Sequence, residues 1–145
     1  MPSAPRTTTR HAGFLLPSLG RRVERSWNTL LRSNEMTNAD FTALAALTEG
    51  PANQRALATR MGIDPRNAGS TVRRLRDRGW ITACRESHDG RVLRLELSQA
   101  GRHRWQALQD ELAAARQDHL GGLTEEEIAE FERLLNKIND HMSAS

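Results

Sequence analysis

The sequence predicts a mainly α-helical protein that carries one small β-hairpin. Three observations support this fold class. Apolar residues recur every three or four positions over most of the chain, strict alternation appears only in Val92–Leu97, and glycine or proline separates most segments. The length of 145 residues fits one domain, with self-association as a further way to bury apolar surface.

The chain is expected to begin with a flexible polar arm and one amphipathic helix. Residues 1–12 contain Pro, Ser, Thr and Arg with little apolar content. The short apolar run that follows is broken by Pro17 and lacks a cleavage site, so we expect no secretory signal. The helix is predicted from a stripe spaced by three and four residues: Leu16, Leu19, Val23, Trp27, Leu30 and Leu31.

Three more helices are predicted before the hairpin. Thr37 or Asn38 caps the first, and Gly50-Pro51 ends it. Pro65 suits the first position of the third helix, which Gly79 closes. The three helices cover about residues 38–49, 53–61 and 65–78.

The hairpin is predicted from a change of period after these helices. Trp80–Arg85 and Val92–Leu97 read as strands around a polar tip at Glu86–Arg91. Ser98 then caps a long helix that ends near Leu120.

A last helix is predicted from Thr124 and Glu127, which have the spacing of a capping box. Its apolar residues form a seam that lacks a partner within one small domain: Ile128, Phe131, Leu135, Ile138 and Met142. Because both terminal stripes exceed the needs of one core, we expect a homodimer. Two helices joined by a turn and followed by a two-stranded hairpin have the order of a winged helix-turn-helix. We therefore divide the chain into an arm (1–12), an N-terminal dimerisation helix (13–36), a winged helix-turn-helix lobe (37–98) and C-terminal dimerisation helices (99–145).

Charge is distributed unevenly along the chain, although the net charge is only +3. Residues 51–105 contain twelve arginines against five acidic residues, whereas residues 106–145 contain three bases against nine acids. A basic block beside an acidic block is typical of a nucleic-acid-binding face with a separate assembly face. Double-stranded DNA is therefore the expected partner.

The helix over 65–78 has two distinct faces on a helical wheel. Ala68, Thr71, Val72 and Leu75 share one side. The other side is polar and can enter a major groove, although a solvated helix face would have the same composition. The following hairpin favours DNA, and the candidate contacts on this helix are Arg66, Asn67, Ser70, Arg73 and Arg74. Gly69 lies inside this helix and indicates either a close approach to the DNA backbone or an irregular helix start.

Five short motifs resemble the multiple-antibiotic-resistance regulator (MarR) family, over Thr37 to Leu108. They are Leu57-Ala58, Gly62-Ile63-Asp64-Pro65, Leu75 four residues before Gly79, Asp89-x-Arg91, and Leu97-Ser98-x-x-Gly101. The resemblance implies a homodimer assembled by its first and last helices, with a recognition helix in the major groove and the wing residue Arg91 in the minor groove. It also implies repression or activation that a small phenolic or lipophilic ligand relieves. Arg66 and Asn67 depart from the small hydroxyl residues that the family often has, so the base sequence is not carried over.

The wing and the aromatic residues each allow two interpretations. Asp89 can hold the Arg91 guanidinium for an A·T-rich minor groove, or the two can form an ordinary surface ion pair. Trp27, Phe41 and Trp105 can line a ligand crevice, or they can simply pack in the core.

The remaining residues give no sign of catalysis or metal binding. Ser70 and Ser98 lack a His and Asp arrangement, and His88, His103 and His119 lack a second ligand at metal spacing. We therefore predict no enzyme, no cofactor, no metal and no membrane span. The single Cys84 is expected to be structural and indicates a cytoplasmic protein. Two alternatives to a sequence-specific regulator stay open: a winged-helix protein-interaction module and an architectural DNA binder without an effector.

Overall fold

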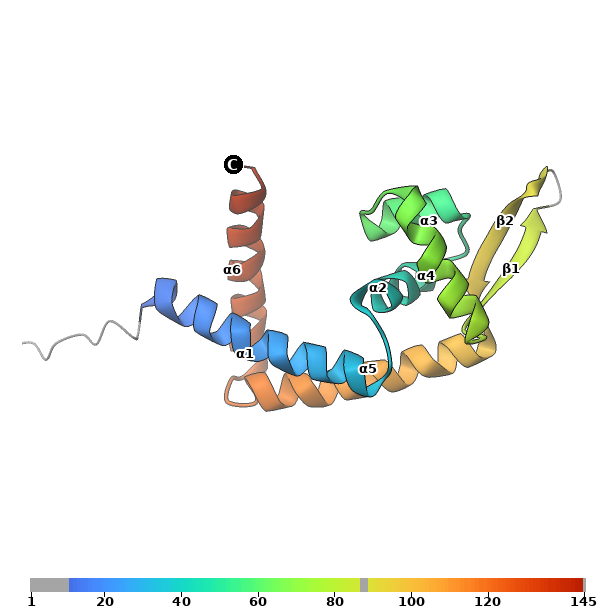
Figure 1. Cartoon of the computed structure of the whole chain (residues 1–145). Coiled ribbons are helices and arrows are strands. Elements are labelled where there is room, and N and C mark those ends of the chain that lie inside the picture. The colour runs from blue at the N-terminus through green and yellow to red at the C-terminus, as the bar shows by residue number, and fades with distance from the viewer. Residues whose placement is uncertain (1–10, 87–88, 145) are drawn as a thin grey trace, which may run out of the picture. The chain divides into compact units, whose positions relative to one another are not determined.

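The computed structural model describes residues 11–86 and 89–144. The chain divides into two compact units, residues 1–109 and 110–145, and the boundary lies within one long helix. The predicted fold class is confirmed: within the described residues, the elements in chain order are α1 (Ala12–Ser33), α2 (Asn38–Thr48), α3 (Gln54–Met61), α4 (Pro65–Asp77), β1 (Ile81–Glu86), β2 (Asp89–Leu97), α5 (Gln99–Leu120) and α6 (Glu125–Ser143) (Figure 1). The predicted arm lies mostly outside the described residues, and α1 already includes Ala12.

Side-chain caps begin the helices where the sequence predicts them. The Thr37 hydroxyl accepts a hydrogen bond from the Asp40 amide at 3.1 Å, and the Asp40 carboxylate accepts one from the Thr37 amide at 3.0 Å. This capping box shows that Thr37, and not Asn38, caps α2. Thr124 and Glu127 form the same arrangement at the start of α6.

The recognition helix predicted from the sequence is α4, and it is regular throughout. It begins at Pro65, with Asp64 as its N-cap, and ends in a left-handed turn at Gly79, where φ is +71°. The Trp80 amide donates to the Leu75 carbonyl at 3.0 Å, which completes the turn. The irregular start that Gly69 suggested is therefore not found.

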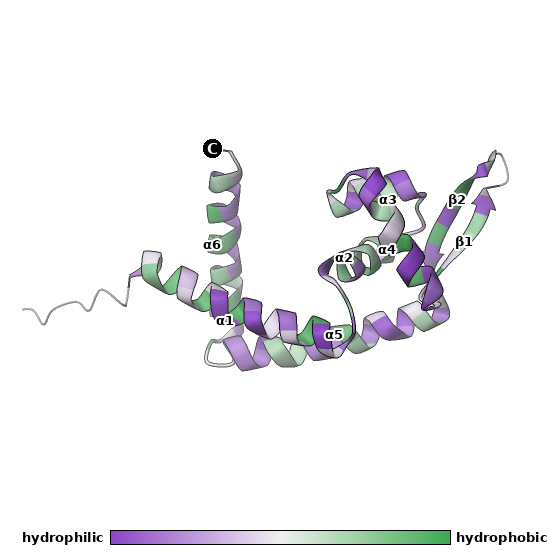
Figure 2. Cartoon of the chain, in the orientation of Figure 1, coloured by the Kyte–Doolittle hydropathy of each residue, from purple (hydrophilic) through white to green (hydrophobic). Residues whose placement is uncertain are grey.

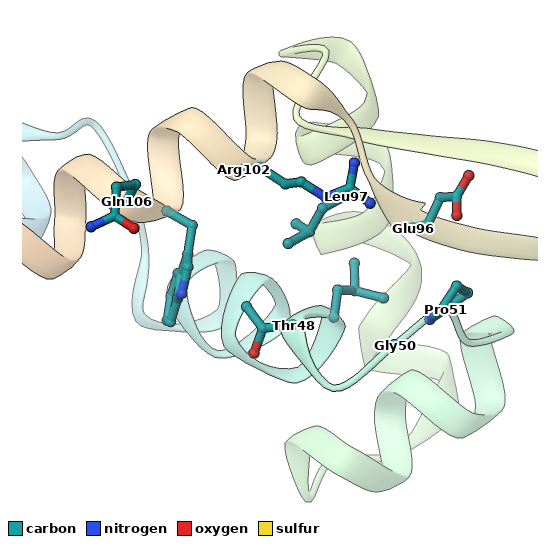
Figure 3. Close-up of a pocket in the computed structure, with 9 residues that line it drawn as sticks. Thr48, Gly50, Pro51, Glu96, Leu97, Arg102 and Gln106 are labelled. Atoms are coloured by element: carbon teal, nitrogen blue, oxygen red, sulfur yellow. The ribbon is translucent and has the colours of Figure 1, made fainter.

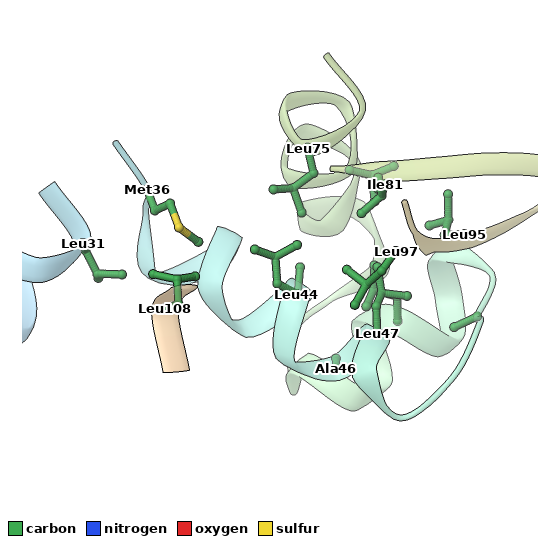
Figure 4. Packing of buried hydrophobic residues seen from close by; sticks show 14 residues of the cluster. Leu31, Met36, Leu44, Ala46, Leu47, Leu75, Ile81, Leu95, Leu97 and Leu108 are labelled. Carbon is green, nitrogen blue, oxygen red and sulfur yellow. The ribbon is translucent and has the colours of Figure 1, made fainter. Parts of the chain in front are cut away.

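The core of the first unit takes one to four buried residues from each of its helices and strands. Leu44, Leu57, Leu75, Leu95 and Leu108 are almost inaccessible to solvent and come from α2, α3, α4, β2 and α5 (Figure 4). Burial of such side chains contributes on the order of 1.5–3 kcal/mol each. The shared core thereby fixes the positions of α4 and the hairpin relative to α2, α3 and the start of α5.

The hairpin is longer than predicted. Ile81 pairs with Leu97 at its base, and the strands continue to Glu86 and from Asp89, so the expected tip at 86–91 is mostly strand. A register shift between Arg85 and Glu86 marks its outer end. The loop before α3 also joins the sheet, because Ala52 and Leu95 exchange two backbone hydrogen bonds of 2.9 and 2.8 Å.

The junction between α4, β1 and α5 is held by a close approach of backbones. A Cβ atom placed on Gly101 would lie 1.9 Å from the Trp80 carbonyl oxygen, so α5 can touch this carbonyl only because residue 101 is glycine. The Ser98 amide donates to the same carbonyl at 3.0 Å, and the Ser98 hydroxyl donates to the Gly79 carbonyl at 2.5 Å. The Ser98 hydroxyl also accepts from the Gly101 amide at 3.0 Å, which caps α5 as predicted.

A partly buried ion pair connects α2 to α4. The Asp40 side chain is only 2% exposed, and its Oδ1 accepts hydrogen bonds from Arg74 Nε at 3.1 Å and Nη2 at 2.8 Å. Arg74 Nη2 also donates to the Thr71 hydroxyl at 3.2 Å. Arg74 therefore has internal partners.

Two helices expose apolar side chains in the single chain, and Figure 2 shows the hydrophobic residues along each. On α1 the exposed residues are Phe14, Leu15, Leu16, Leu19 and Val23. On α6 they are Phe131, Leu134, Leu135, Ile138 and Met142, whereas Ile128 is buried. Ile128, the first residue of the predicted seam, is thus unavailable for an interface.

The glycine contact at α5 leads to a stability prediction. Gly101→Ala should lower the free energy of unfolding by roughly 1–3 kcal/mol, because the Trp80 carbonyl or α5 must move to admit the methyl group. Gly69→Ala is the matched control: its Cβ would lie 3.4 Å from Gln54 Nε2, an ordinary contact. That variant should be neutral or gain up to about 1 kcal/mol, since alanine favours helix. Urea unfolding measures both, and equal effects would contradict the proposed contact.

The ion pair leads to a second stability prediction. Arg74→Met should lower the free energy of unfolding by about 1–3 kcal/mol, because the buried Asp40 carboxylate loses two charged donors. Arg73→Met removes the same charge from an exposed neighbour and should stay within about 0.5 kcal/mol of the parent. Thermal unfolding of the two variants decides this, and a destabilised Arg73→Met with a normal Arg74→Met would reverse the assignment.

Candidate nucleic-acid interface

The solvent-facing side of α4 has the composition predicted from the wheel. Ala68, Thr71, Val72 and Leu75 are buried, as expected. The opposite side exposes four of the predicted contact residues: Arg66, Asn67, Ser70 and Arg73. The helix therefore presents hydrogen-bond donors and acceptors outward over about two of its turns.

Arg66 is held by the residue that caps its own helix. Arg66 Nε and Nη2 donate to the two oxygens of Asp64 at 3.1 and 3.0 Å, and the Arg66 amide donates to Asp64 Oδ1 at 2.8 Å. The guanidinium hydrogen bonds, followed by the amide hydrogen bond, lower the pKa of the Asp64 carboxyl below its ordinary value. The Asp64 carboxylate in turn raises the pKa of Arg66. Both side chains keep their charges at neutral pH.

A hollow of about 480 Å³ runs along one flank of α4. It is lined by Gln54 of α3 and, on α4, by Gly69, Val72, Arg73, Arg76 and Asp77. Arg76 was not among the predicted contacts, although it is exposed and lies three residues after Arg73. This spacing on one helix face was the signal that could have identified Arg76.

Arg74 differs from its neighbours, because its guanidinium is bound to Asp40 and Thr71. Its DNA contact stays a prediction. The wheel places Arg74 beside the outward residues but does not show that a buried carboxylate lies within reach.

The wing carries exposed arginines on both strands. Arg91 is exposed on β2, as the prediction requires, and Arg85 and Arg94 are exposed as well. The predicted support from Asp89 concerns a side chain outside the described part of the structure. Arg85 and Arg94 belong to the basic block 51–105 but were not among the predicted contacts.

The connection from α4 to the wing is fixed by the Trp80 side chain as well as by its backbone. The guanidinium carbons of Arg78 and Arg104 lie 4.7 and 5.6 Å from the centre of the Trp80 ring, within the range of cation–π attraction. Arg104 Nη2 also donates to the Asn34 side chain at the corner between α1 and α2. These contacts position the end of α4, the start of β1 and the first turns of α5 together.

The three predicted ligand-crevice residues lie together, but mostly against one another. The ring centres of Trp27 and Phe41 are 4.7 Å apart at nearly a right angle, and those of Phe41 and Trp105 are 5.2 Å apart. All three pack against the core. Edge-to-face packing of this kind is itself stabilising.

A cavity of about 340 Å³ borders Trp105 on the side of the hairpin base (Figure 3). Leu47 and Leu97 are buried residues in its lining, and Arg102, Glu96 and Gln106 contribute charged or polar groups. Trp27 and Phe41 are not among the lining residues. The cavity combines apolar lining with a cation, as small-molecule sites commonly do.

The structure also bears on the predictions made for Cys84, for metal binding and for a membrane span. Cys84 is exposed on β1, so the expectation of a buried structural cysteine is wrong. Across residues 11–86 and 89–144, no group of three His, Cys, Asp or Glu side chains is placed to hold a metal ion. No helix among the same residues has the length and apolar character needed to cross a bilayer.

Comparisons with known proteins agree with this geometry. A family model described as the MarR family matches residues 35–92, which contain α2, α3, α4 and most of the hairpin. The PcaV transcriptional regulator from Streptomyces coelicolor is 30% identical, with 93% of this chain and 99% of that chain covered and a TM-score of 0.73.

Two more distant structures share the fold. Wild-type MarR from Escherichia coli, in its apo form, is 22% identical over 88% of this chain and 96% of its own, with a TM-score of 0.71. BpsR from Bordetella bronchiseptica, whose DNA binding is regulated by 6-hydroxynicotinic acid, is 23% identical over 88% and 97%, with a TM-score of 0.68. The outward arginines of α4 agree with a DNA-binding role. The family model and the 30% identity to a regulator along nearly the whole chain show that the protein belongs to the MarR family of winged helix-turn-helix transcriptional regulators.

Proposed function

We propose that this regulator acts in the cytoplasm as a homodimer that binds a pseudo-palindromic DNA operator. The observation that carries the proposal is the pairing of an outward polar row on α4 with an exposed arginine, Arg91, on the adjoining wing. MarR-family regulators bind DNA and effector ligands as dimers. The side chains of α4 and those of the wing suit different grooves of the duplex, so each element is assigned its own groove.

In this proposal α4 reads the major groove and the wing reaches the minor groove. Arginine can donate two hydrogen bonds to guanine O6 and N7, and Asn67 can pair with adenine. Arg66 and Arg73 are the exposed α4 arginines assigned to bases. Arg91 enters the minor groove, where the negative potential of narrow A·T-rich segments attracts a guanidinium.

The exposed apolar faces of α1 and α6 support the homodimer. A monomer in water would leave five large apolar side chains of each helix hydrated. A twofold axis buries the same faces on both copies. Leu135 and Ile138 are suitable positions for disrupting such an interface, since Ile128 is already buried within the chain.

The cavity beside Trp105 is the site we assign to an effector. Its volume of about 340 Å³ fits a single aromatic ring with substituents. The Arg102 amide donates to the Ser98 carbonyl at 2.9 Å, whereas its guanidinium has no hydrogen bond or ion pair within the described residues and can bind an anionic group of the ligand. BpsR responds to a hydroxylated aromatic acid, and we infer an effector of similar chemistry for this chain.

The operator geometry is testable by changing its spacing. Two winged helices related by a twofold axis should contact major grooves about one helical turn, ~34 Å, apart. Inserting five base pairs between the half-sites rotates one by about half a turn and should abolish two-site binding. Mobility-shift assays with an operator selected from source-genome fragments measure the effect.

The same assay separates the alternatives. Equal binding to the original and the spaced operator would exclude rigid dimeric docking. A lack of preference among promoter fragments indicates an architectural binder, and a lack of binding to any duplex at low salt indicates a protein-interaction module.

The effector site is tested by ligand binding rather than by DNA release alone. Titration with 6-hydroxynicotinic acid and related hydroxybenzoic acids should change tryptophan fluorescence and weaken operator binding. Arg102→Met should raise the Kd for these acids about tenfold, as loss of a charge-assisted hydrogen bond does. Arg55→Met serves as control, because it removes the same charge from an exposed residue of α3 that does not line the cavity. An equal loss of affinity in the two variants, or no loss in Arg102→Met, would place the ligand elsewhere.

A further inference from the structure

The Asp64–Arg66 pair combines two functions in one carboxylate. As the N-cap of α4, Asp64 is oriented by the Arg66 amide, which donates to Oδ1 at 2.8 Å. The same carboxylate accepts both the Nε and the Nη2 hydrogen bonds of the Arg66 side chain. The cap therefore fixes the direction of the acceptor, and the acceptor fixes the direction of the guanidinium.

The geometry leaves one edge of the guanidinium available. Nε and Nη2 are occupied by Asp64, while Nη1 has no partner among the described residues. The Arg66 side chain is 89% exposed, so this end is accessible from solvent. The edge formed by Nη1 and the second hydrogen of Nη2 can still donate two parallel hydrogen bonds, as recognition of guanine O6 and N7 requires.

We propose that Asp64 is a positioning residue that presents Arg66 for bidentate recognition of one guanine in each operator half-site. The inference rests on the proposed function, in which α4 lies in the major groove. It deepens that function by naming a base and a specificity-determining pair. Asp64 contacts no base itself.

The physical reason is pre-organisation. A free arginine side chain samples many rotamers, and fixing it on binding costs free energy that weakens the specific complex. Asp64 holds most of this side chain before DNA arrives. With α4 in the major groove, as proposed, the Asp64 carboxylate would also lie in the negative potential of the DNA phosphates, which disfavours binding to any sequence. Asp64 should therefore increase discrimination between bases while it lowers affinity for DNA in general.

These opposite effects allow a sharp experiment. Asp64→Ser keeps a residue that caps helices about as well as aspartate but removes the bidentate acceptor. Asp77→Ser is the matched control, because it removes the same charge from an exposed residue at the C-terminal end of α4, whereas Arg66 lies at its N-terminal end. Kd values are measured with fluorescein-labelled duplexes: the selected operator, its single-base variants and an unrelated sequence. Arg66→Ala first identifies the base pair that Arg66 reads.

The expected results differ for each protein. The parent should prefer guanine at that position by about 5–150-fold, the range of one good bidentate contact. Asp64→Ser should lose at least about fivefold of this preference and bind the unrelated duplex at least as tightly as the parent. Asp77→Ser should also bind the unrelated duplex more tightly but keep the full preference for guanine.

Other outcomes overturn specific statements. If Asp64→Ser keeps the parent's preference, Asp64 does not position Arg66. If it loses affinity equally for all duplexes, its role is structural only, and the inference is wrong. If the parent has no base preference that Arg66→Ala removes, the proposed major-groove role of Arg66 fails instead. Asp64→Asn, whose side chain also caps helices, is measured in the same DNA-binding assay. Circular dichroism checks the fold of both variants, so that a folding defect in one of them does not decide the result.

Discussion

The close approach of α5 to the Trp80 carbonyl is the constraint on which the DNA-binding lobe depends. Gly101 permits this approach. The Ser98 hydroxyl stabilises it by donating to the Gly79 carbonyl and accepting from the Gly101 amide. Trp80 lies three residues after the end of α4 and directly precedes β1. A single junction therefore determines the positions of the helix and of the wing, and both must be correct for one duplex to contact them together.

The elements of this lobe were predictable because their signals are local. Thr37, Asn53 and Asp64 each cap the helix that follows, and a cap needs only residues two or three positions away. The buried side of α4 was also correct, since helical periodicity alone determines which residues share a face. The strands of the hairpin were predicted with the right type and base, but too short at the tip.

The partners of individual side chains could not be predicted in the same way. A helical wheel gives the direction of Arg74, but Asp40 lies 34 residues earlier and comes close only when α2 packs against α4. Similarly, the tendency of cysteine to be buried does not apply to Cys84, whose position on β1 faces solvent. The partner of Arg74 and the exposure of Cys84 depend on how distant segments pack, and the packing of distant segments cannot be read from local sequence patterns.

The arginines of α4 show why charge alone is a poor guide to specificity. Arg73 and Arg76 border an open hollow, Arg74 is paired with a buried carboxylate, and Arg66 is paired with an exposed one. All four raise the positive potential near DNA, which increases affinity for any sequence. A base is distinguished only when a guanidinium has a fixed orientation, because the hydrogen-bond pattern of guanine is directional. On this helix Arg74 and Arg66 are both held by a carboxylate, but only Arg66 is largely exposed, so our proposal assigns the recognition of guanine to Arg66.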